Sequence, residues 1–428
     1  MSSSGFIDFL NHASGSQFAA CAYTKSVLVE SGYTELHESE LWNLEPQKKY
    51  FLVRGNSAIV AFHTNKSTST SRMIISGSHL DSPYLKLKPN ADLTSVGLVG
   101  VACETYGGGI WNTWFDRDLG VSGRVVLKNG EQRIFTVKQP ILDIPALCVH
   151  LDKDKKYLVD TEKDLHAYLK SSDKKESATK YILEKICDDL NVPKDSIESY
   201  DICLCDSQPA TMLANKFIVG QGIDNLNGVY TSLMAFFNSE KENLEKEQLD
   251  VFVAFDNEEV GSVTRTGAES NFLEKILHRV HFSLFKNCTT ESYDISCAKS
   301  IALSVDGAHA NHPNIDKSEK NHKVTLNGGP VLKNHCGQRY MSDAFLRLLI
   351  QKAAVDVKTQ TFVLRQDLAG GSTIGPHVSA CTGITTIDLG NPMLSMHSIR
   401  EICGAQDVEA MTALIEKCYT NFPCLENF

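Results

Sequence analysis

The sequence predicts an α/β protein whose central sheet is interrupted by a separate, strand-rich insert. Three observations support this prediction. The chain has 428 residues, whereas a single domain usually holds about 100 to 200. Short apolar runs that end at Gly, Asp or His occur before residue 85 and after residue 215, as expected for buried strands of an α/β sheet. Between these positions the runs alternate in polarity, which is typical of strands with one exposed face.

The first part of the chain predicts a helix followed by strands. Residues 6–28 carry apolar side chains at helical spacing, and the run YFLVRGNSAIVAF at 50–62 alternates as strands do. Residues 73–75 then form a short buried-strand signal. His79 and Asp81 therefore follow directly after a strand end.

The middle of the chain predicts a β-rich insert. The segments SGRVVLKN and RIFTVK alternate between apolar and polar residues. The α/β pattern then returns, with a helix at 228–238 and strands at 250–255, 301–305 and 384–389. We therefore assign residues 1–85 and 215–428 to one discontinuous domain and residues 86–214 to the insert.

Charge and cysteine content restrict the function classes. The net charge is −10, and the chain contains no block of five or six Lys or Arg that would follow a nucleic acid or an anionic membrane. The thirteen Cys include no CxxC pair, which predicts reduced thiols in a chain of this size. No run reaches the roughly 18 apolar residues of a membrane span, and the start lacks the pattern of a signal peptide. We expect a cytoplasmic protein with no nucleic-acid or membrane partner.

Histidines and acidic residues gather near the ends of the predicted strands. They are His79 and Asp81 in GSHLDSP, Asp224 in GIDNLNG, Glu258 and Glu259 in VAFDNEEVGS, Asp306 in LSVDGAHA, and His397 in LSMHSIRE. In an open α/β sheet, ligands bind at the carboxyl ends of the strands. We expect these side chains to converge at that edge.

The same residues have the composition of a dinuclear metal site. Two zinc ions about 3.5 to 4 Å apart need a bridging carboxylate and further N or O ligands for each ion. Asp224 would bridge, and His79 with Asp306 would complete one site. One glutamate of the adjacent pair would complete the other site with His397, and the second glutamate would be the general base. The spacing leaves open which glutamate does which. Manganese or cobalt would also suit these ligands.

Each residue alone also has a purely structural interpretation. His79 could be a buried core histidine, Asp224 a helix N-cap and Asp306 a turn residue. Asp81 could accept a hydrogen bond from the second ring nitrogen of His79, or could cap the turn before Ser82. The adjacent glutamates would repel each other at a strand end unless a cation or a raised pKa relieves them. The prediction of a metal site therefore depends on the whole set.

Long motifs in this order resemble the aspartyl aminopeptidase family. They are GSHLDSP, YGGGIWNTWFDRDLGVSGRV, DNEEVGS, SVDGAHANHPN and SMHSIRE, with ELHESELWNLEPQKKYFLVRGNSAIVAF near the start and GGPVLKNHCGQRY late in the chain. The resemblance implies a phosphorylase/hydrolase-like catalytic domain, with a central mixed sheet flanked by helices, and an inserted β-rich dimerisation domain. It also implies a homo-oligomer, a tetrahedral dodecamer built from dimers.

The resemblance further implies roles for individual residues. It implies one zinc on His79, Asp224 and Asp306, a second on Asp224, Glu259 and His397, Glu258 as general base, and Asp81 behind His79. The implied substrates are peptides with a free N-terminus, from which Asp or Glu is removed.

Other residues are candidates for binding substrate. The resemblance implies that His150 reaches into a neighbouring subunit's site, although it could simply be an exposed strand-end residue. His309 and His312 are candidates for contacting the substrate or the developing oxyanion, but they could instead be ordinary loop histidines. Lys333 is our candidate for binding an acidic side chain, although lysines are usually solvated.

Two other functions use the same residues. One is a neutral, Leu-type aminopeptidase or a carboxypeptidase-like deacylase, and the other is a non-catalytic zinc-binding particle scaffold. The glycines of YGGGIW could suggest a nucleotide site, but they lack GxGxxG spacing and a following helix. We therefore expect them to form turns.

Overall fold

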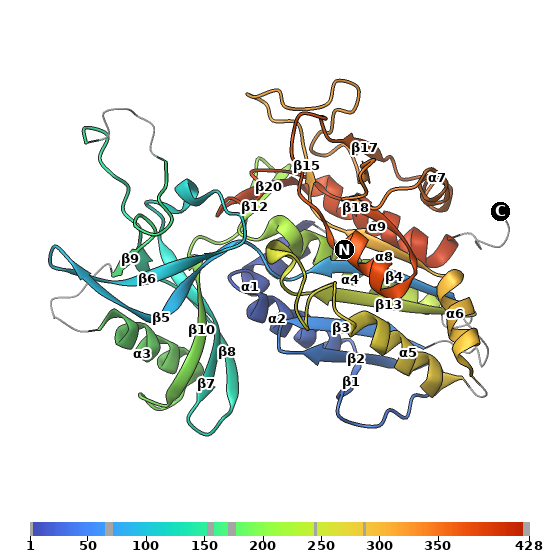
Figure 1. Ribbon diagram of the computed structural model, residues 1–428, viewed down its shortest axis with the longest axis horizontal. Helices are drawn as coiled ribbons and strands as arrows, with labels where there is room; N and C mark the ends of the chain where they lie inside the picture. The colour runs from blue at the N-terminus through green and yellow to red at the C-terminus, as the bar shows by residue number, and fades with distance from the viewer. Residues whose placement is uncertain are drawn as a thin grey trace.

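A computed structural model describes residues 3–64, 72–151, 158–169, 177–243, 246–285 and 288–422. These residues form an α/β part with a large mixed sheet and a β-barrel beside it (Figure 1). The predicted fold class, α/β with an inserted β-rich unit, is confirmed. The domain boundaries and the use of the insert for dimerisation stay predictions.

The large sheet places several strand ends at one edge. Its strand order is β1-β2-β3-β13-β4-β14-β18-β16-β17. The strands are β1 Thr34–Glu35, β2 Lys49–Arg54, β3 Ala58–His63, β4 Arg72–His79, β13 Gln248–Phe255, β14 Ile301–Val305, β16 Val331–Asn334, β17 Gln360–Val363 and β18 Thr385–Gly390. The middle strands β13, β4, β14 and β18 run parallel. Every residue of β13 and β14 is buried, because helices cover both faces of such a sheet.

Helices cover both faces of the sheet, and two hydrophobic cores result. One core includes residues of α1 Ser3–Ala13, α2 Gln17–Glu30, α4 Ile223–Asn243, α7 Ala344–Ala353 and α9 Ala405–Asn421. The other includes residues of α5 Phe272–Leu284, α6 Thr290–Ala298 and α8 Ile374–Thr382. Neighbouring residues of β13 alternate between the cores: Phe252 belongs to the first and Val253 to the second, as side chains of a strand must.

The prediction of one helix over residues 6–28 is wrong, because this segment forms the two helices α1 and α2. The chain turns at Gly15, whose φ of 117° is accessible to glycine but strained for other residues. The Ser16 side chain then accepts a hydrogen bond from the N–H of Ala19 and caps α2. Apolar spacing continued across the break, so periodicity alone did not reveal it.

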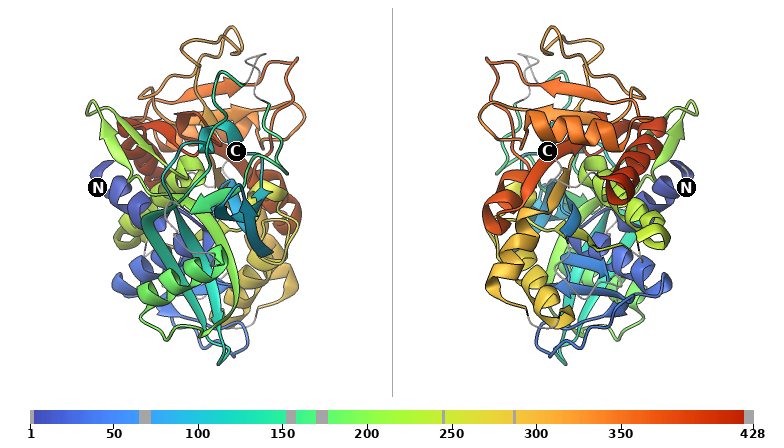
Figure 2. Two further views of the ribbon diagram at one scale, coloured as in Figure 1. Left: turned by 90° about the vertical axis from the view of Figure 1, so that its left-hand side faces the viewer. Right: turned by 90° about the vertical axis from the view of Figure 1, so that its right-hand side faces the viewer.

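The barrel has its own hydrophobic core. Its closed strand order is β10-β5-β6-β9-β8-β7, and closure leaves no exposed sheet edge. The elements are β5 Tyr84–Ser95, β6 Leu98–Tyr106, β7 Leu119–Leu127, β8 Gln132–Asp143, β9 Ala167–Leu169, β10 Ile197–Asp206 and α3 Ala178–Leu190. The alternating runs noted in the sequence lie on β7 and β8. Figure 2, left, shows the barrel from its outer side.

A third sheet joins these two parts of the molecule. Its order is β11-β12-β20-β19-β15, and its strands are β11 Thr211–Leu213, β12 Phe217–Gly220, β15 Ala308–His309, β19 Pro392–Leu394 and β20 Glu401–Gly404. Two short 3₁₀ turns, η1 Trp111–Trp114 and η2 Glu258–Val260, lie outside the sheets. Among the helices of the described ranges, none is long and apolar enough to cross a membrane.

Candidate metal centre

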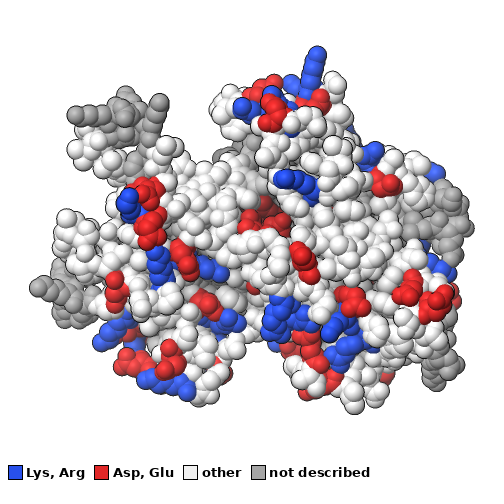
Figure 3. Space-filling view, in the orientation of Figure 1, with Lys and Arg blue, Asp and Glu red and all other residues white. Residues whose placement is uncertain are grey.

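Three neighbouring strands of the large sheet end at the same place. β4 ends at His79, the turn after β13 carries Glu258 and Glu259, and β14 is followed directly by Asp306. The His79 ring nitrogen Nε2 lies 3.5 Å from Oδ1 of Asp306 and 3.9 Å from Oε2 of Glu258. These side chains therefore meet at the carboxyl edge of the sheet. Figure 3 shows acidic side chains in a hollow near the middle of this face.

Two further residues come from segments that adjoin strands of the third sheet. Asp224 follows β12 and opens α4 with a non-helical backbone, and His397 lies between β19 and β20 with a φ of 69°. Asp224 Oδ1 is 3.6 Å from Nε2 of His79, and its Oδ2 is 3.4 Å from Nε2 of His397. His397 Nε2 is also 3.3 Å from Oε2 of Glu259. The Asp224 carboxylate thus lies between the two imidazoles.

These side chains form overlapping groups with the geometry of a metal site. Within each group, one ligand atom from each residue lies within 4.8 Å of the others. The groups are His79, Asp224 and Asp306; Asp224, Glu259 and His397; and His79, Glu258 and Glu259. Imidazole nitrogen and carboxylate oxygen are ligands that zinc prefers. The first two groups share Asp224, as two metal ions with one bridging carboxylate require.

The electrostatics of the cluster fit a bound cation. Asp224 Oδ1 and Glu259 Oε1 are buried, and neither has a hydrogen-bond partner among the described residues. Burial, with added repulsion from neighbouring carboxylates, raises the pKa of Glu258 to about 8 and that of Glu259 well above its ordinary value. Burial alone would lower the pKa of His79, but the surrounding carboxylates raise it well above normal. Buried charges are costly unless they are paired, and metal ions would pair these.

Asp81 connects the two strand ends. Its carboxylate accepts hydrogen bonds from the N–H groups of Glu258, at 3.2 Å, and Glu259, at 3.1 Å. His79 Nδ1 donates to the main-chain oxygen of Asp81 at 3.0 Å and lies 3.4 Å from its Oδ1. The nearer contact to the ring thus comes from the backbone of Asp81. Asp81 therefore holds the His79 imidazole at the end of β4. It also holds the turn with Glu258 and Glu259, which we call the glutamate turn, at the end of β13.

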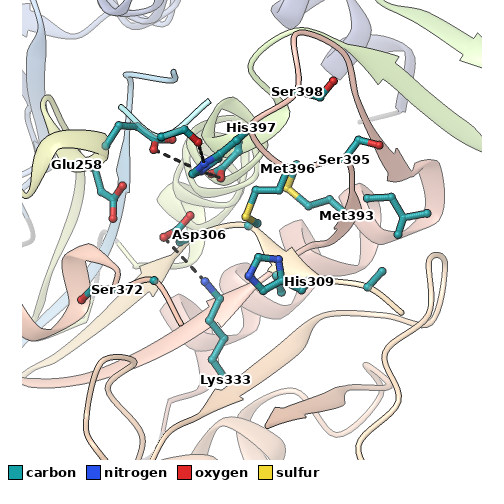
Figure 4. Close-up of a pocket in the computed structure, with 18 of the residues that line it drawn as sticks. Glu258, Asp306, His309, Lys333, Ser372, Met393, Ser395, Met396, His397 and Ser398 are labelled. Atoms are coloured by element: carbon teal, nitrogen blue, oxygen red, sulfur yellow. Dashed lines mark hydrogen bonds and ion pairs between the residues drawn. The ribbon is translucent and has the colours of Figure 1, made fainter. Parts of the chain in front are cut away.

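A cavity of about 770 Å³ opens over the cluster. Lys333 points into it from β16 (Figure 4), although only 3% of this residue is exposed. Its Nζ is 3.9 Å from Oδ2 of Asp306 and 5.2 Å from the centre of the Tyr340 ring. Burial lowers the pKa of Lys333, but the charges of Asp306 and Asp388 raise it overall. Lys333 is therefore a buried cation and not a solvated surface lysine.

The three histidines expected to bind substrate occupy different places. His309 and His312 line the cavity, and the His309 ring packs edge-on against Phe362 with 5.8 Å between centroids. Burial, followed by the charge of Lys333, lowers the pKa of His309. His150 lies after β8, is exposed and does not line the cavity of its own chain.

Glu401 belongs to this site but was missed in the sequence. It is 1% exposed, and its carboxylate accepts the N–H of Asp224 at 2.9 Å and the N–H of His397 at 2.7 Å. The only sequence signal was its place at the end of SMHSIRE. Tyr106 was also missed. Its hydroxyl donates to Oδ2 of Asp81 at 2.7 Å.

Imidazoles and carboxylates around a shared acid, beside a cavity at the carboxyl edge of an α/β sheet, define a metal-dependent hydrolase. The family model described as aminopeptidase I zinc metalloprotease (M18) matches residues 9–419. The chain therefore belongs to the M18 family of zinc metalloproteases, and it is an aminopeptidase. The resemblance stated from the motifs is confirmed.

Individual relatives are similar in sequence or structure to almost the whole chain. An aspartyl aminopeptidase of Dictyostelium discoideum is 36% identical, covering 98% of this chain and 96% of the relative. A chain in the cryo-EM structure of the Ape4 and Nbr1 complex is 33% identical with a TM-score of 0.92, covering 98% of this chain and 85% of that one. A chain of the S. cerevisiae mApe1 dodecamer is 26% identical with a TM-score of 0.83, covering 98% and 96%.

Proposed function

We propose that this aminopeptidase removes N-terminal Asp or Glu from peptides by means of two zinc ions. The observation that carries the proposal is the Asp224 carboxylate, whose oxygens face the rings of His79 and His397 at 3.6 and 3.4 Å. In the proposal Asp224 would be shared by both metal sites, and Asp306 would complete one site with His79. Glu259 would complete the other site with His397. Manganese or cobalt could replace zinc at these ligands.

The chemistry follows from the residues around the proposed ligands. Bound zinc lowers the pKa of water and polarises the scissile carbonyl. Glu258, which lines the cavity, takes the proton of the attacking water and later gives it to the leaving amine. Asp81 keeps Glu258 in place by accepting its backbone N–H. His309 and His312 contact the substrate or the developing oxyanion from the cavity wall.

Lys333 supports the acidic preference. Among the described residues that line the cavity, it is the only Lys or Arg. A buried ammonium group is an effective partner for a substrate carboxylate, because little water competes for it. Met393, Met396 and Phe362 also line the cavity, and this apolar surface favours the alternative, a neutral N-terminal residue.

A substrate panel tests the proposal. Asp-, Glu-, Leu- and Ala-aminoacyl substrates are compared with added zinc or manganese, and we expect the two acidic substrates to be fastest. Lys333→Met should lower kcat/KM on them about 30-fold or more and leave the Leu rate nearly unchanged. An equal loss on Leu would reject the role of Lys333, and a faster wild-type rate on Leu would favour the neutral enzyme. Hydrolysis of N-acylated substrates would favour a deacylase. Zinc binding without any hydrolysis would favour the scaffold.

We also propose that the chain assembles through its insert. A solved relative is a dodecamer, and exposed apolar side chains surround His150: Leu147, Val149 and Leu151 are 48%, 61% and 71% exposed. Residues 86–214 would be the dimerisation domain, residues 1–85 and 215–428 the catalytic domain, and dimers would form a tetrahedral dodecamer. His150 would then enter a neighbour's site.

Sedimentation tests this assembly. Val149→Asp should lower the mass measured by analytical ultracentrifugation, because a buried interface does not tolerate an unpaired charge. An unchanged mass would reject this loop as an interface. The proposed location is the cytoplasm, where the cysteine thiols, all unpaired in the described ranges, would stay reduced.

A further inference from the structure

We propose that residues 106–110, which leave the barrel strand β6, are a positioning element of the metal centre. The barrel would then complete the catalytic geometry as well as serve assembly. This inference rests on the ligand set of the proposed function. It also gives a use to the YGGGIW motif, whose glycines we expected only to form turns.

The first contact is with His397. Its Nδ1 donates a hydrogen bond to the carbonyl oxygen of Gly108 at 2.8 Å. A carbonyl can only accept, so this bond selects the tautomer whose Nε2 is free to bind a metal. Nε2 is the atom that faces Asp224 and Glu259, at 3.4 and 3.3 Å. The main-chain oxygen of His397 also accepts the N–H of Ile110 at 2.8 Å.

These contacts hold a residue in an unfavourable conformation. His397 has a φ of 69°, and a non-glycine residue keeps such a backbone only when its surroundings determine it. Residues 106–110 provide two of the determining bonds, one to the ring and one to the backbone. The orientation of this proposed ligand therefore depends on the barrel.

The second contact is with the glutamate turn. The Tyr106 hydroxyl donates to Asp81 at 2.7 Å and accepts from Nδ2 of Asn257, the residue before Glu258, at 2.9 Å. A Cβ atom at Gly107 would lie 3.1 Å from Cβ of Glu259, closer than the roughly 3.5 to 4.0 Å at which carbon atoms pack. The segment therefore approaches both the proposed base and a proposed ligand, and glycine permits the approach.

The turn that carries His397 also contacts other parts of the barrel. Ile399, two residues after His397, is buried in the barrel core, and its N–H donates to Oγ1 of Thr113 at 3.1 Å. Arg117 of the barrel side and Arg400 both donate to the buried carboxylate of Asp206, at 2.9 and 2.7 Å. A shift of the barrel would therefore move the contacts of His397 as well.

A pair of glycine variants tests whether the close approach of Gly107 to Glu259 affects zinc binding. Gly107 and Gly130 have φ values of 75° and 84°, but only a Cβ at Gly107 meets other atoms, because nothing lies within 4 Å of the Gly130 position. Both Ala variants carry the same backbone strain. We expect Gly107→Ala to weaken one of two zinc sites about 10- to 100-fold, as other changes around metal ligands do. Gly130→Ala should bind zinc like the wild type. The measurement is chelator competition on the whole protein.

A tyrosine pair gives a second measurement if Gly107→Ala does not fold. Tyr106→Phe removes only the hydroxyl that reaches Asp81, and Tyr200→Phe removes a barrel hydroxyl that donates to Pro89. We expect Tyr106→Phe to lower kcat about tenfold or more with KM and zinc content unchanged. Tyr200→Phe should leave kcat unchanged.

His397→Ala separates the two possible failures. If it keeps both zinc ions at wild-type affinity, the ligand set of the proposed function is wrong. If it loses one zinc while the Tyr106 and Gly107 variants match their controls in zinc affinity and kcat, the positioning inference is overturned and the proposed function stands.

Discussion

The edge of the large sheet and the turn between β19 and β20 each contribute a histidine to the cluster, but they hold it differently. His79 ends β4 between two parallel neighbours, and its side chain is 1% exposed. His397 lies outside any strand, has a φ of 69°, and its side chain is 30% exposed. Its bonds go to Gly108 and Ile110, which follow β6 of the barrel, and to Glu401 of the third sheet.

The two histidines are thus positioned by different kinds of contact. Parallel strands bring their ends together as a consequence of sheet formation, so the His79 side needs few additional contacts. The His397 side depends on contacts between separate parts of the molecule. We expect the second side to be the more easily disturbed.

The largest effect should come from substitution of Glu258, the proposed general base. Glu258→Gln keeps the shape but cannot accept the proton, so kcat should fall about 10³-fold while zinc content stays near two per chain. Glu259→Gln is the matched control, since it should lower the zinc content. Steady-state rates and metal analysis measure both. Retained activity in Glu258→Gln would contradict its assignment as base.

Metal removal tests whether the His397 side of the centre is held less firmly than the His79 side. During titration with a chelator, zinc should leave in two steps, and the less tightly held ion should be the one at His397 and Glu259. In His397→Ala the first step should be absent and one zinc should remain. Simultaneous loss of both ions from the wild-type protein would show that the two sides are equally stable.

The sequence predicted that His397 would lie with the residues of the sheet edge, but it did not predict the contacts that hold His397 there, for a physical reason. An apolar run followed by His79 or Asp306 is a local signal, and parallel pairing then determines where the side chain lies. The bond between His397 and Gly108 joins residues 289 positions apart, and no local pattern encodes such a contact. The burial of Lys333 likewise depends on the strands and loops that surround β16.

Glu401 should produce the next largest effect. Its carboxylate accepts two N–H groups, and in Glu401→Gln the amide nitrogen would face one of these donors. We expect zinc affinity at the His397 site to fall about 10- to 100-fold. Asp407→Asn is a matched control, because the Asp407 carboxylate also accepts two backbone N–H groups, those of Asn327 and Gly329, and neither is a proposed ligand. Equal zinc affinities in the two variants would rule out a specific role for Glu401.

The smallest effect should come from Thr113, which ties the His397 turn to the barrel. Its hydroxyl accepts the N–H of Ile399 at 3.1 Å and donates to the main-chain oxygen of Ile110 at 2.7 Å. Thr113→Val keeps the shape and removes both bonds, each contributing about 1 kcal/mol to stability. Because one of these bonds holds the turn that carries His397, part of the lost stability should appear as weaker zinc binding. We expect zinc affinity to drop about two- to fivefold.

Thr136→Val provides the comparison for Thr113→Val. The Thr136 hydroxyl bonds to Phe135 and Ser122 within the barrel, away from the turn. Both variants should lose similar stability in urea unfolding, because each loses hydrogen bonds of the same kind. Only Thr113→Val should bind zinc more weakly. If the two variants bind zinc equally well, the barrel does not help to hold the His397 side, and both sides of the centre depend on the α/β part alone.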